Sequence, residues 1–233
     1  MGNLTNLVGT IPHSITNLVG TIPHSISKCS KLTILDLSHN KLTGLIHSSL
    51  GYLTHLRFLN MRGNNLTSDS SLSFMNSLTN CRNLTSLPLS LNPLNDMLPA
   101  SAGNLYTSLR GLFLRNNKLK GSIGDNLCKL QHLDVIDLTQ NQFSGSLPNC
   151  LGNVISLRKI HLSFNKLSSS IPPSLGNLKD LVVLDLSSNN MVGSLPREIG
   201  NLKAATLIDL SMNRSQMKFL KKLEDYKLWC TYL

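Results

Sequence analysis

Leucine and isoleucine recur along this chain in one spacing, L-x-x-L-x-L-x-x-N-x-L, which returns about every 24 residues. Clear copies are KLTILDLSHNKLTG at 31–44, HLDVIDLTQNQFSG at 132–145 and SLRKIHLSFNKLSS at 156–169. Within each copy, the alternation L-x-L predicts a short strand that buries one face and exposes the other. One turn cannot bury its leucines alone, so eight copies in one frame predict a stack of eight turns.

Each copy also contains one asparagine, at the point where the chain must bend away from the strand. Successive asparagines are 24, 28, 25, 24, 24, 24 and 24 residues apart. An Asn side chain both donates and accepts hydrogen bonds, so it can bond the backbone of its own and adjacent turns. We therefore predict a structural role for this Asn ladder and not a ligand-binding one. Its members are Asn40, Asn64, Asn92, Asn117, Asn141, Asn165, Asn189 and Asn213.

A second consensus, L-x-G-x-I/L-P-x-x-L-G-N-L, lies between the strands, as in FSGSLPNCLGNV (143–154) and MVGSLPREIGNL (191–202). With these two motifs, the chain over about 5–213 resembles plant-specific leucine-rich repeats (LRRs). It is most similar to the extracellular domains of plant receptor-like serine/threonine kinases of subfamily twelve. The resemblance implies an α/β fold, a right-handed solenoid with a parallel β-sheet on its concave face and 3₁₀ or loop segments on its convex face.

The resemblance also implies a location and a kind of partner. It places the chain at the extracellular face of the plasma membrane or in the apoplast, where it binds a peptide or protein on its concave face, with a co-receptor as a further partner. Such recognition serves signalling and defence perception. Two alternatives stay open. One is a secreted, kinase-free inhibitor of the polygalacturonase-inhibitor kind, and the other is a truncated receptor-like gene product without an independent function.

The ends of the chain depart from the repeat. The segment TNLVGTIPHSI occurs twice, at 5–15 and 16–26, and eleven residues are too few for a full turn. We therefore expect residues 1–31 to form irregular half-turns, with no concave strand within 5–26, and the solenoid to occupy 32–213. Residues 214–233 form a basic tail with helical spacing. We expect this tail to cover the open core end, and membrane binding is the alternative.

Two longer turns, at 68–84 and 97–109, contain insertions of four residues and one residue. We expect these insertions to bulge from the back or flank and leave the strand register intact.

Composition narrows the function further. The chain has 22 Lys and Arg against 12 Asp and Glu, a net charge of +10. It contains no basic run, and its few aromatics are mostly not interleaved with basic residues, so nucleic acid is not favoured as a partner. No apolar stretch reaches the length of about 20 residues that spans a bilayer, and the first residues do not read as a signal peptide. The five cysteines are widely spaced and predict buried free thiols.

Catalytic motifs are missing from this sequence. It lacks the VAIK, HRD and DFG motifs of a kinase, and also GxSxG and HExxH. Asp137 and Asp185 share one column with other aspartates, but they belong to the LDLS consensus and His161 lies between them. We therefore predict no enzymatic activity, no cofactor and no metal site, although the full-length relatives carry a kinase domain.

Exposed strand positions that leave the consensus indicate a binding surface. Arg62 and Arg115 fall in one column, and Arg57, Arg110 and Arg158 fall in another. Arginine forks suit carboxylates, and aromatic rings suit apolar side chains. The hypothesis is that this basic strip binds an acidic or carboxylate-bearing peptide or an acidic protein surface, and the alternative is a solvated face. The basic strip comprises Arg57, Phe58, Arg62, Arg110, Phe113, Arg115, Arg158, Lys159, His161 and Phe164.

Glycosylation sequons give a further expectation. Asn65 and Asn83 lie in N-x-T sequons outside the ladder and are candidates for glycans if the chain is secreted. Asn213 also lies in a sequon, but it is a ladder position whose amide we expect to be occupied.

Overall fold

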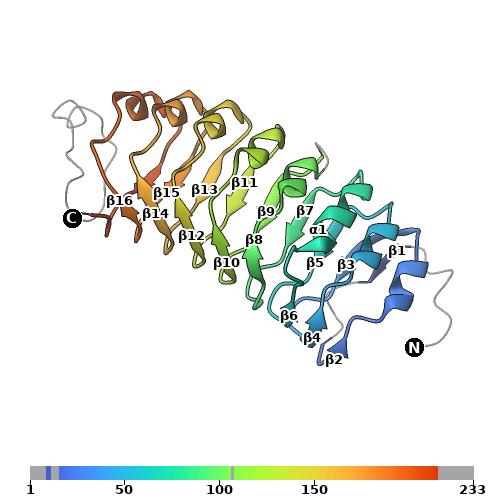
Figure 1. Cartoon of the computed structure of the whole chain (residues 1–233). Coiled ribbons are helices and arrows are strands. Elements are labelled where there is room, and N and C mark those ends of the chain that lie inside the picture. The colour runs from blue at the N-terminus through green and yellow to red at the C-terminus, as the bar shows by residue number, and fades with distance from the viewer. Residues whose placement is uncertain (1–8, 12–15, 106–107, 215–233) are drawn as a thin grey trace.

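The computed structural model describes residues 9–11, 16–105 and 108–214. In this part of the chain, successive turns stack side by side, with helical segments along one edge of the stack (Figure 1). A nine-stranded parallel sheet, which we call the main sheet, runs through every turn. Its strands, in spatial order, are β1 (Gly9–Ile11), β3 (Leu32–Asp36), β5 (Phe58–Asn60), β7 (Ser86–Pro88), β9 (Gly111–Phe113), β11 (Val135–Asp137), β13 (Lys159–His161), β15 (Val183–Asp185) and β17 (Leu207–Asp209). We number the turns one to eight from β3 to β17.

The L-x-L alternation places one face of the main sheet in the core. In β11, Ile136 is buried whereas Val135 and Asp137 are half-buried. Leucines at the equivalent inward positions of the interior turns are almost completely inaccessible to solvent, and they form one continuous core from Ile22 to Ala205. The opposite face of the main sheet therefore carries the variable side chains.

Short helices close the other side of the core. They are η1 (His24–Lys28), η2 (Ser48–Tyr52), α1 (Ser73–Ser77), η3 (Leu78–Asn80), η4 (Ala100–Asn104), η5 (Asp125–Lys129), η6 (Asn149–Asn153), η7 (Pro173–Asn177) and η8 (Arg197–Asn201). The glycine of the L-G-N motif lets neighbouring helices pack closely. A Cβ on Gly152 would lie 2.1 Å from the Ser174 carbonyl oxygen, and one on Gly176 would lie 2.2 Å from that of Glu198.

The asparagines join successive turns by hydrogen bonds. The Asn141 Nδ2 donates to the carbonyl oxygens of Leu138 and Thr139 in its own turn, and of Leu114 in the turn before, at 2.9–3.2 Å. Its Oδ1 accepts from the N–H of Leu119 at 3.1 Å. These bonds satisfy backbone groups inside the core, where an unpaired polar group would be costly. The same pattern recurs at Asn64, Asn92, Asn117, Asn165, Asn189 and Asn213.

Flank strands follow the asparagines and form two separate sheets. One contains β2 (Val19–Thr21), β4 (Lys41–Leu45) and β6 (Asn65–Thr67), and the other contains β8 (Asn95–Met97), β10 (Lys118–Gly121), β12 (Gln142–Gly145), β14 (Lys166–Ser169) and β16 (Asn190–Met191). Pro93 follows its ladder asparagine as Lys118 does one turn later. The Lys118 N–H donates to the Leu94 carbonyl at 2.8 Å, and Lys118 pairs in register with Asn95. Because proline has no N–H to donate, the hydrogen bonding of the flank strands ends between β6 and β8.

The insertion in residues 68–84 forms α1 and η3 and leaves the main sheet continuous, since Phe58 pairs with Ser86 in the expected frame. The amino-terminal prediction is wrong in one respect. Gly9–Ile11, in the first copy of the repeated segment, pairs in parallel with β3, with a register shift after Gly9. The rest of 1–15, and the predicted tail helix at 215–233, lie outside the described residues.

The cysteine prediction is also wrong in part. Cys128 and Cys150 form a disulfide between η5 and η6, with Cα atoms 5.7 Å apart. Their separation of 22 residues is close to one repeat, so stacking places them in adjacent turns. Cys29 and Cys81 are buried and take no part in this disulfide. Burial raises the pKa of Cys81 to about 11, which keeps this thiol protonated. Cys230 lies outside the described residues.

Candidate functional site

Three arginines of the basic strip lie in one column at the start of the main-sheet strands. The backbone N–H groups of Thr85 and Arg110 donate to the carbonyls of Arg57 and Thr85, each at 2.8 Å. The same connection continues through Asp134 to Arg158 at 2.7 and 2.8 Å. Arg57, Arg110 and Arg158 therefore alternate with Thr85 and Asp134 along the stack. All three arginines are exposed, but the Asp134 carboxylate reduces the positive charge at one end of this column.

A second column holds Arg62 and Arg115 with Ser90 between them. The N–H of Gly63 donates to the Ser90 carbonyl at 2.9 Å, and the N–H of Leu91 donates to that of Arg115 at 2.8 Å. Ser90 is only 4% exposed, whereas both arginines are exposed. With strands about 4.8 Å apart, the two arginine backbones are about 10 Å apart. The Arg115 Nε donates to Gln140 Oε1 at 3.4 Å, and the structure brings no carboxylate into this column between the two arginines.

The aromatic rings of the strip are not in one row. Phe58 pairs with Ser86, and Phe113 pairs with Pro88 and Asp137, so the two rings belong to neighbouring columns of the sheet. Both rings are half-buried. Phe164 lies beyond the strand end and is 54% exposed. The rings therefore offer separate apolar contacts and not one continuous aromatic surface.

Turn six contributes the last basic side chains. Lys159 is exposed and pairs in register with Val135 and Val183 on the two neighbouring strands. His161 is half-buried, and its register neighbours are Asp137 and Asp185. The strip is therefore acidic as well as basic at this end, and its purely basic part is confined to turns two to four.

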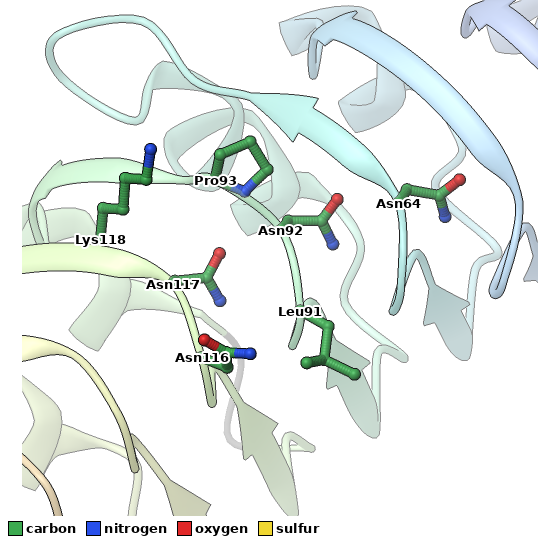
Figure 2. Close-up of a pocket in the computed structure, with 7 residues that line it drawn as sticks. All are labelled: Asn64, Leu91, Asn92, Pro93, Asn116, Asn117 and Lys118. Carbon is green, nitrogen blue, oxygen red and sulfur yellow. The ribbon is translucent and has the colours of Figure 1, made fainter.

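A hollow of about 260 Å³ adjoins this purely basic part and was not predicted (Figure 2). It lies where the strands of turns two, three and four end and the chain bends at the ladder asparagines Asn64, Asn92 and Asn117. Leu91 and Pro93 are its apolar residues, and Lys118 and Asn116 extend from the next turn on one side of them. The lining residues are Asn64, Leu91, Asn92, Pro93, Asn116, Asn117 and Lys118. The signal that could have found it is the pair Leu91 and Pro93, since most other turns carry polar residues or glycine at these positions.

The sequon asparagines differ in accessibility. Asn65 on β6 and Asn83 before turn three are exposed. Asn213 is half-buried, and its amide makes four hydrogen bonds to backbone groups of turns seven and eight. Within the part of the chain that the structure describes, no group of three or more His, Cys, Asp or Glu side chains could hold a metal ion. None of the helices in these residues is long and apolar enough to cross a membrane.

Comparisons with known proteins agree with this architecture. Family models described as leucine-rich repeats match residues 14–66, 55–82, 108–130, 132–154 and 155–203. The LRR receptor-like serine/threonine-protein kinase EFR of Arabidopsis thaliana is 38% identical over 88 residues, which are 37% of this chain and 8% of that protein. Receptor kinase-like protein Xa21 of Oryza sativa subsp. japonica is 49% identical over 63 residues, 26% of this chain and 6% of that protein. This chain thus spans less than a tenth of either relative.

A solved structure gives a longer match. The LRR ectodomain of the receptor kinase GASSHO1/SCHENGEN3 from Arabidopsis thaliana, in complex with CASPARIAN STRIP INTEGRITY FACTOR 2, superimposes with a TM-score of 0.74 and 31% sequence identity. The superposition covers 88% of this chain and 28% of that ectodomain. Repeats, relatives and solved ectodomain confirm the predicted resemblance to plant LRR receptor kinases.

Proposed function

Because this chain belongs to the leucine-rich-repeat family and its relatives include plant LRR receptor kinases, we propose that it is a non-catalytic module that recognises an acidic peptide or protein. The ligand lies along the basic strip on the exposed face of the main sheet. Two solved structures of one similar receptor, the Arabidopsis receptor kinase HAESA, are complexes with a peptide hormone and, in one of them, also a co-receptor, which supports the same roles here.

One observation carries the proposal. Arg62 and Arg115 are exposed in one column, about 10 Å apart, with only the small, buried Ser90 between them. The segments 56–64, 84–94 and 109–118 contain no Asp or Glu, so neither arginine is neutralised from its own or the intervening turn. Guanidinium groups that no carboxylate of these segments neutralises favour, at this spacing, a chain that presents carboxylates two to three residues apart.

The disulfide supports an extracellular location. Disulfides form and persist in oxidising compartments such as the cell exterior. We accordingly propose glycans on the exposed Asn65 and Asn83 and none on Asn213, whose amide is occupied. Intact-mass measurement of secreted protein, before and after glycosidase treatment, checks this. A glycan on Asn213 would contradict the folded geometry of turn eight.

The binding proposal is tested by charge reversal. The probe is a set of synthetic peptides rich in Glu and blocked at both ends, with Gln-substituted peptides as the uncharged set. Replacing Arg62 and Arg115 by Glu should weaken binding of the Glu peptides at least tenfold and reduce its salt dependence, because charge-assisted hydrogen bonds are lost.

The matched control replaces Lys179 and Lys203 by Glu. Both lysines are exposed in the loops after η7 and η8, so the change in net charge is the same but lies off the strip. Equal losses in the two variants would mean that binding responds to net charge alone. Binding of the Glu peptides no stronger than that of the Gln peptides would overturn the proposal itself.

A further inference from the structure

The hollow in Figure 2 lies next to the purely basic part of the strip, between turns two, three and four. Its volume of about 260 Å³ is below the range of roughly 300–1,000 Å³ that is usual for small-molecule sites. A hollow of this size suits one side chain of a longer ligand. We propose that it is a pocket that anchors an apolar side chain of an acidic peptide, an inference that rests on the function proposed above.

Leu91 is the first apolar residue of this pocket, and it occupies an unfavourable backbone conformation. Its φ is +60°, in the left-handed region that bulky L-residues avoid. Five other turns fill this position with residues that are polar or glycine, namely His39, Gly63, Asn116, Gln140 and Ser188. Leu91 therefore opposes local backbone preference, and its side chain is half-buried at the hollow.

Pro93 is the second apolar residue, and it also departs from the repeat. Other turns carry polar residues at this position, namely Lys41, Asn65, Lys118, Gln142, Lys166 and Asn190. The proline ends the flank ladder between β6 and β8, and its ring contributes to the lining of the hollow. Phe164 and Met212 share the left-handed position with Leu91 but have no such partner, since polar Lys166 and Arg214 follow them. Among the described turns, only turn three has an apolar residue both directly before and directly after its ladder asparagine.

The charges around the hollow decide which apolar side chain fits. Lys118 lines the hollow, and the exposed Arg62 and Arg115 lie within two residues of its lining residues Asn64 and Asn116. The segments 56–64, 84–94 and 109–118 contain no Asp or Glu, and the Asp96 carboxylate lies beyond them in β8, in register with Leu119. An uncharged apolar ligand would leave these cations unpaired, whereas flanking carboxylates complement them. An extended peptide rises about 3.3 Å per residue and alternates its faces, so carboxylates two residues before and two residues after the anchor share its face. They are about 13 Å apart, and their flexible side chains can reach Arg62 and Arg115, about 10 Å apart. The occupant is therefore an apolar residue with Asp or Glu on both sides.

The test uses two blocked peptides, Glu-Glu-Leu-Glu-Glu and Glu-Glu-Ala-Glu-Glu, with Gln-Gln-Leu-Gln-Gln as the uncharged probe. The key variant is Leu91→Asn, which removes one of the two apolar lining residues and places a residue that tolerates φ > 0. Met212→Asn is the matched control, because Met212 has φ +53° and lies five turns away. Thermal melting checks that both variants fold, and neither should lower Tm.

In the wild type, the Leu peptide should bind roughly tenfold more tightly than the Ala peptide, as expected for burial of one aliphatic side chain. Leu91→Asn should bring that ratio close to one and leave the Ala peptide unchanged, and Met212→Asn should preserve the ratio. If the Glu peptides bind through Arg62 and Arg115 but Leu91→Asn leaves the ratio unaltered, the pocket is overturned and the proposed function stands. If no Glu peptide binds more tightly than the Gln peptide, both proposals are overturned together.

Discussion

The turns after Leu109 and the turns around Pro93 follow one consensus, yet the elements behind the main sheet differ. The later turns repeat every 24 residues, contribute four strands of the five-stranded flank sheet and include the Cys128–Cys150 disulfide. The earlier turns include an insertion that forms α1, a break in the flank sheet and the hollow. We call these the regular half and the interrupted half.

This difference shows which contacts the repeat requires. The main sheet continues through both halves because the core leucines and the ladder asparagines are present in every turn. The flank sheet breaks between β6 and β8, where Pro93 lacks the backbone N–H that other turns have at this position and where the insertion also lies. A repeat protein can therefore open a surface feature in one turn without losing its stack.

The largest expected effect is a difference in the loss of unfolding free energy between two alanine substitutions, one at a ladder asparagine of the regular half and one at a ladder asparagine of the interrupted half. Asn165→Ala leaves the buried N–H of Phe143 and the carbonyls of Leu138 and Leu162 without their partner. We expect a loss of about 4 kcal/mol in the free energy of unfolding. Asn64 makes the same bonds but lines the hollow, where water can replace the amide, so Asn64→Ala should cost about 2 kcal/mol. Urea denaturation of both variants measures the difference, and equal losses would contradict it.

The disulfide should account for the next largest difference between the halves. Replacing Cys128 and Cys150 by Ser opens a loop of 22 residues and should lower the free energy of unfolding by about 3 kcal/mol. A reductant should destabilise the wild type by a similar amount and leave the double variant unchanged. Persistence of full wild-type stability in reductant would show that the bond contributes little.

A proline introduced into the regular half should reproduce the interruption. Lys166 occupies the position of Pro93 and pairs with Ser144 across the flank sheet. Lys166→Pro removes that N–H and should cost about 1–2 kcal/mol, with faster amide exchange in β14 and an intact main sheet. Lys166→Ala keeps the N–H and is the control. If the two variants exchange alike, the missing N–H does not explain the break.

The smallest effect concerns the insertion itself. Hydrogen bonds from the Ser73 hydroxyl and backbone N–H hold the pKa of the Asp69 carboxyl below its usual value. A lowered folded-state pKa adds stability above the unfolded pKa of about 3.9, and this stability is lost as pH falls through the folded value. Acid should therefore loosen α1 before the regular turns, as amide exchange near pH 3 would measure. Ser73→Ala should reduce this acid sensitivity, and an unchanged pH response would contradict the assignment.

Most of the fold could be predicted because each turn repeats the same local chemistry. The L-x-L pairs marked the strands of turns one to eight, and the ladder positions marked the bends that follow them. The disulfide was missed because the cysteine spacing matches no disulfide or zinc motif, although 22 residues is close to one repeat and thus places the two thiols in adjacent turns. The hollow was missed because Leu91 and Pro93 come together with residues of turns two and four only after stacking.

The basic strip could be predicted column by column, because the register follows from the repeat. Arg62 and Arg115 lie in one column of the sheet, as the spacing required. The rings of Phe58, Phe113 and Phe164 share no column of the sheet, unlike the arginines, since each ring belongs to a different position within its turn. The column of a residue follows from sequence, whereas the direction of its side chain depends on its neighbours in adjacent turns.

The repeated segment TNLVGTIPHSI shows where sequence alone is insufficient. In the second copy, Val19–Thr21 forms β2 in the flank sheet, paired with β4. In the first copy, the overlapping residues Gly9–Ile11 form β1 in the main sheet, paired with β3. The sequence by itself determined that this segment can form a strand, through its apolar and β-branched residues. Only the tertiary structure decided which sheet it joins, because pairing depends on the free strand edge that the chain can reach.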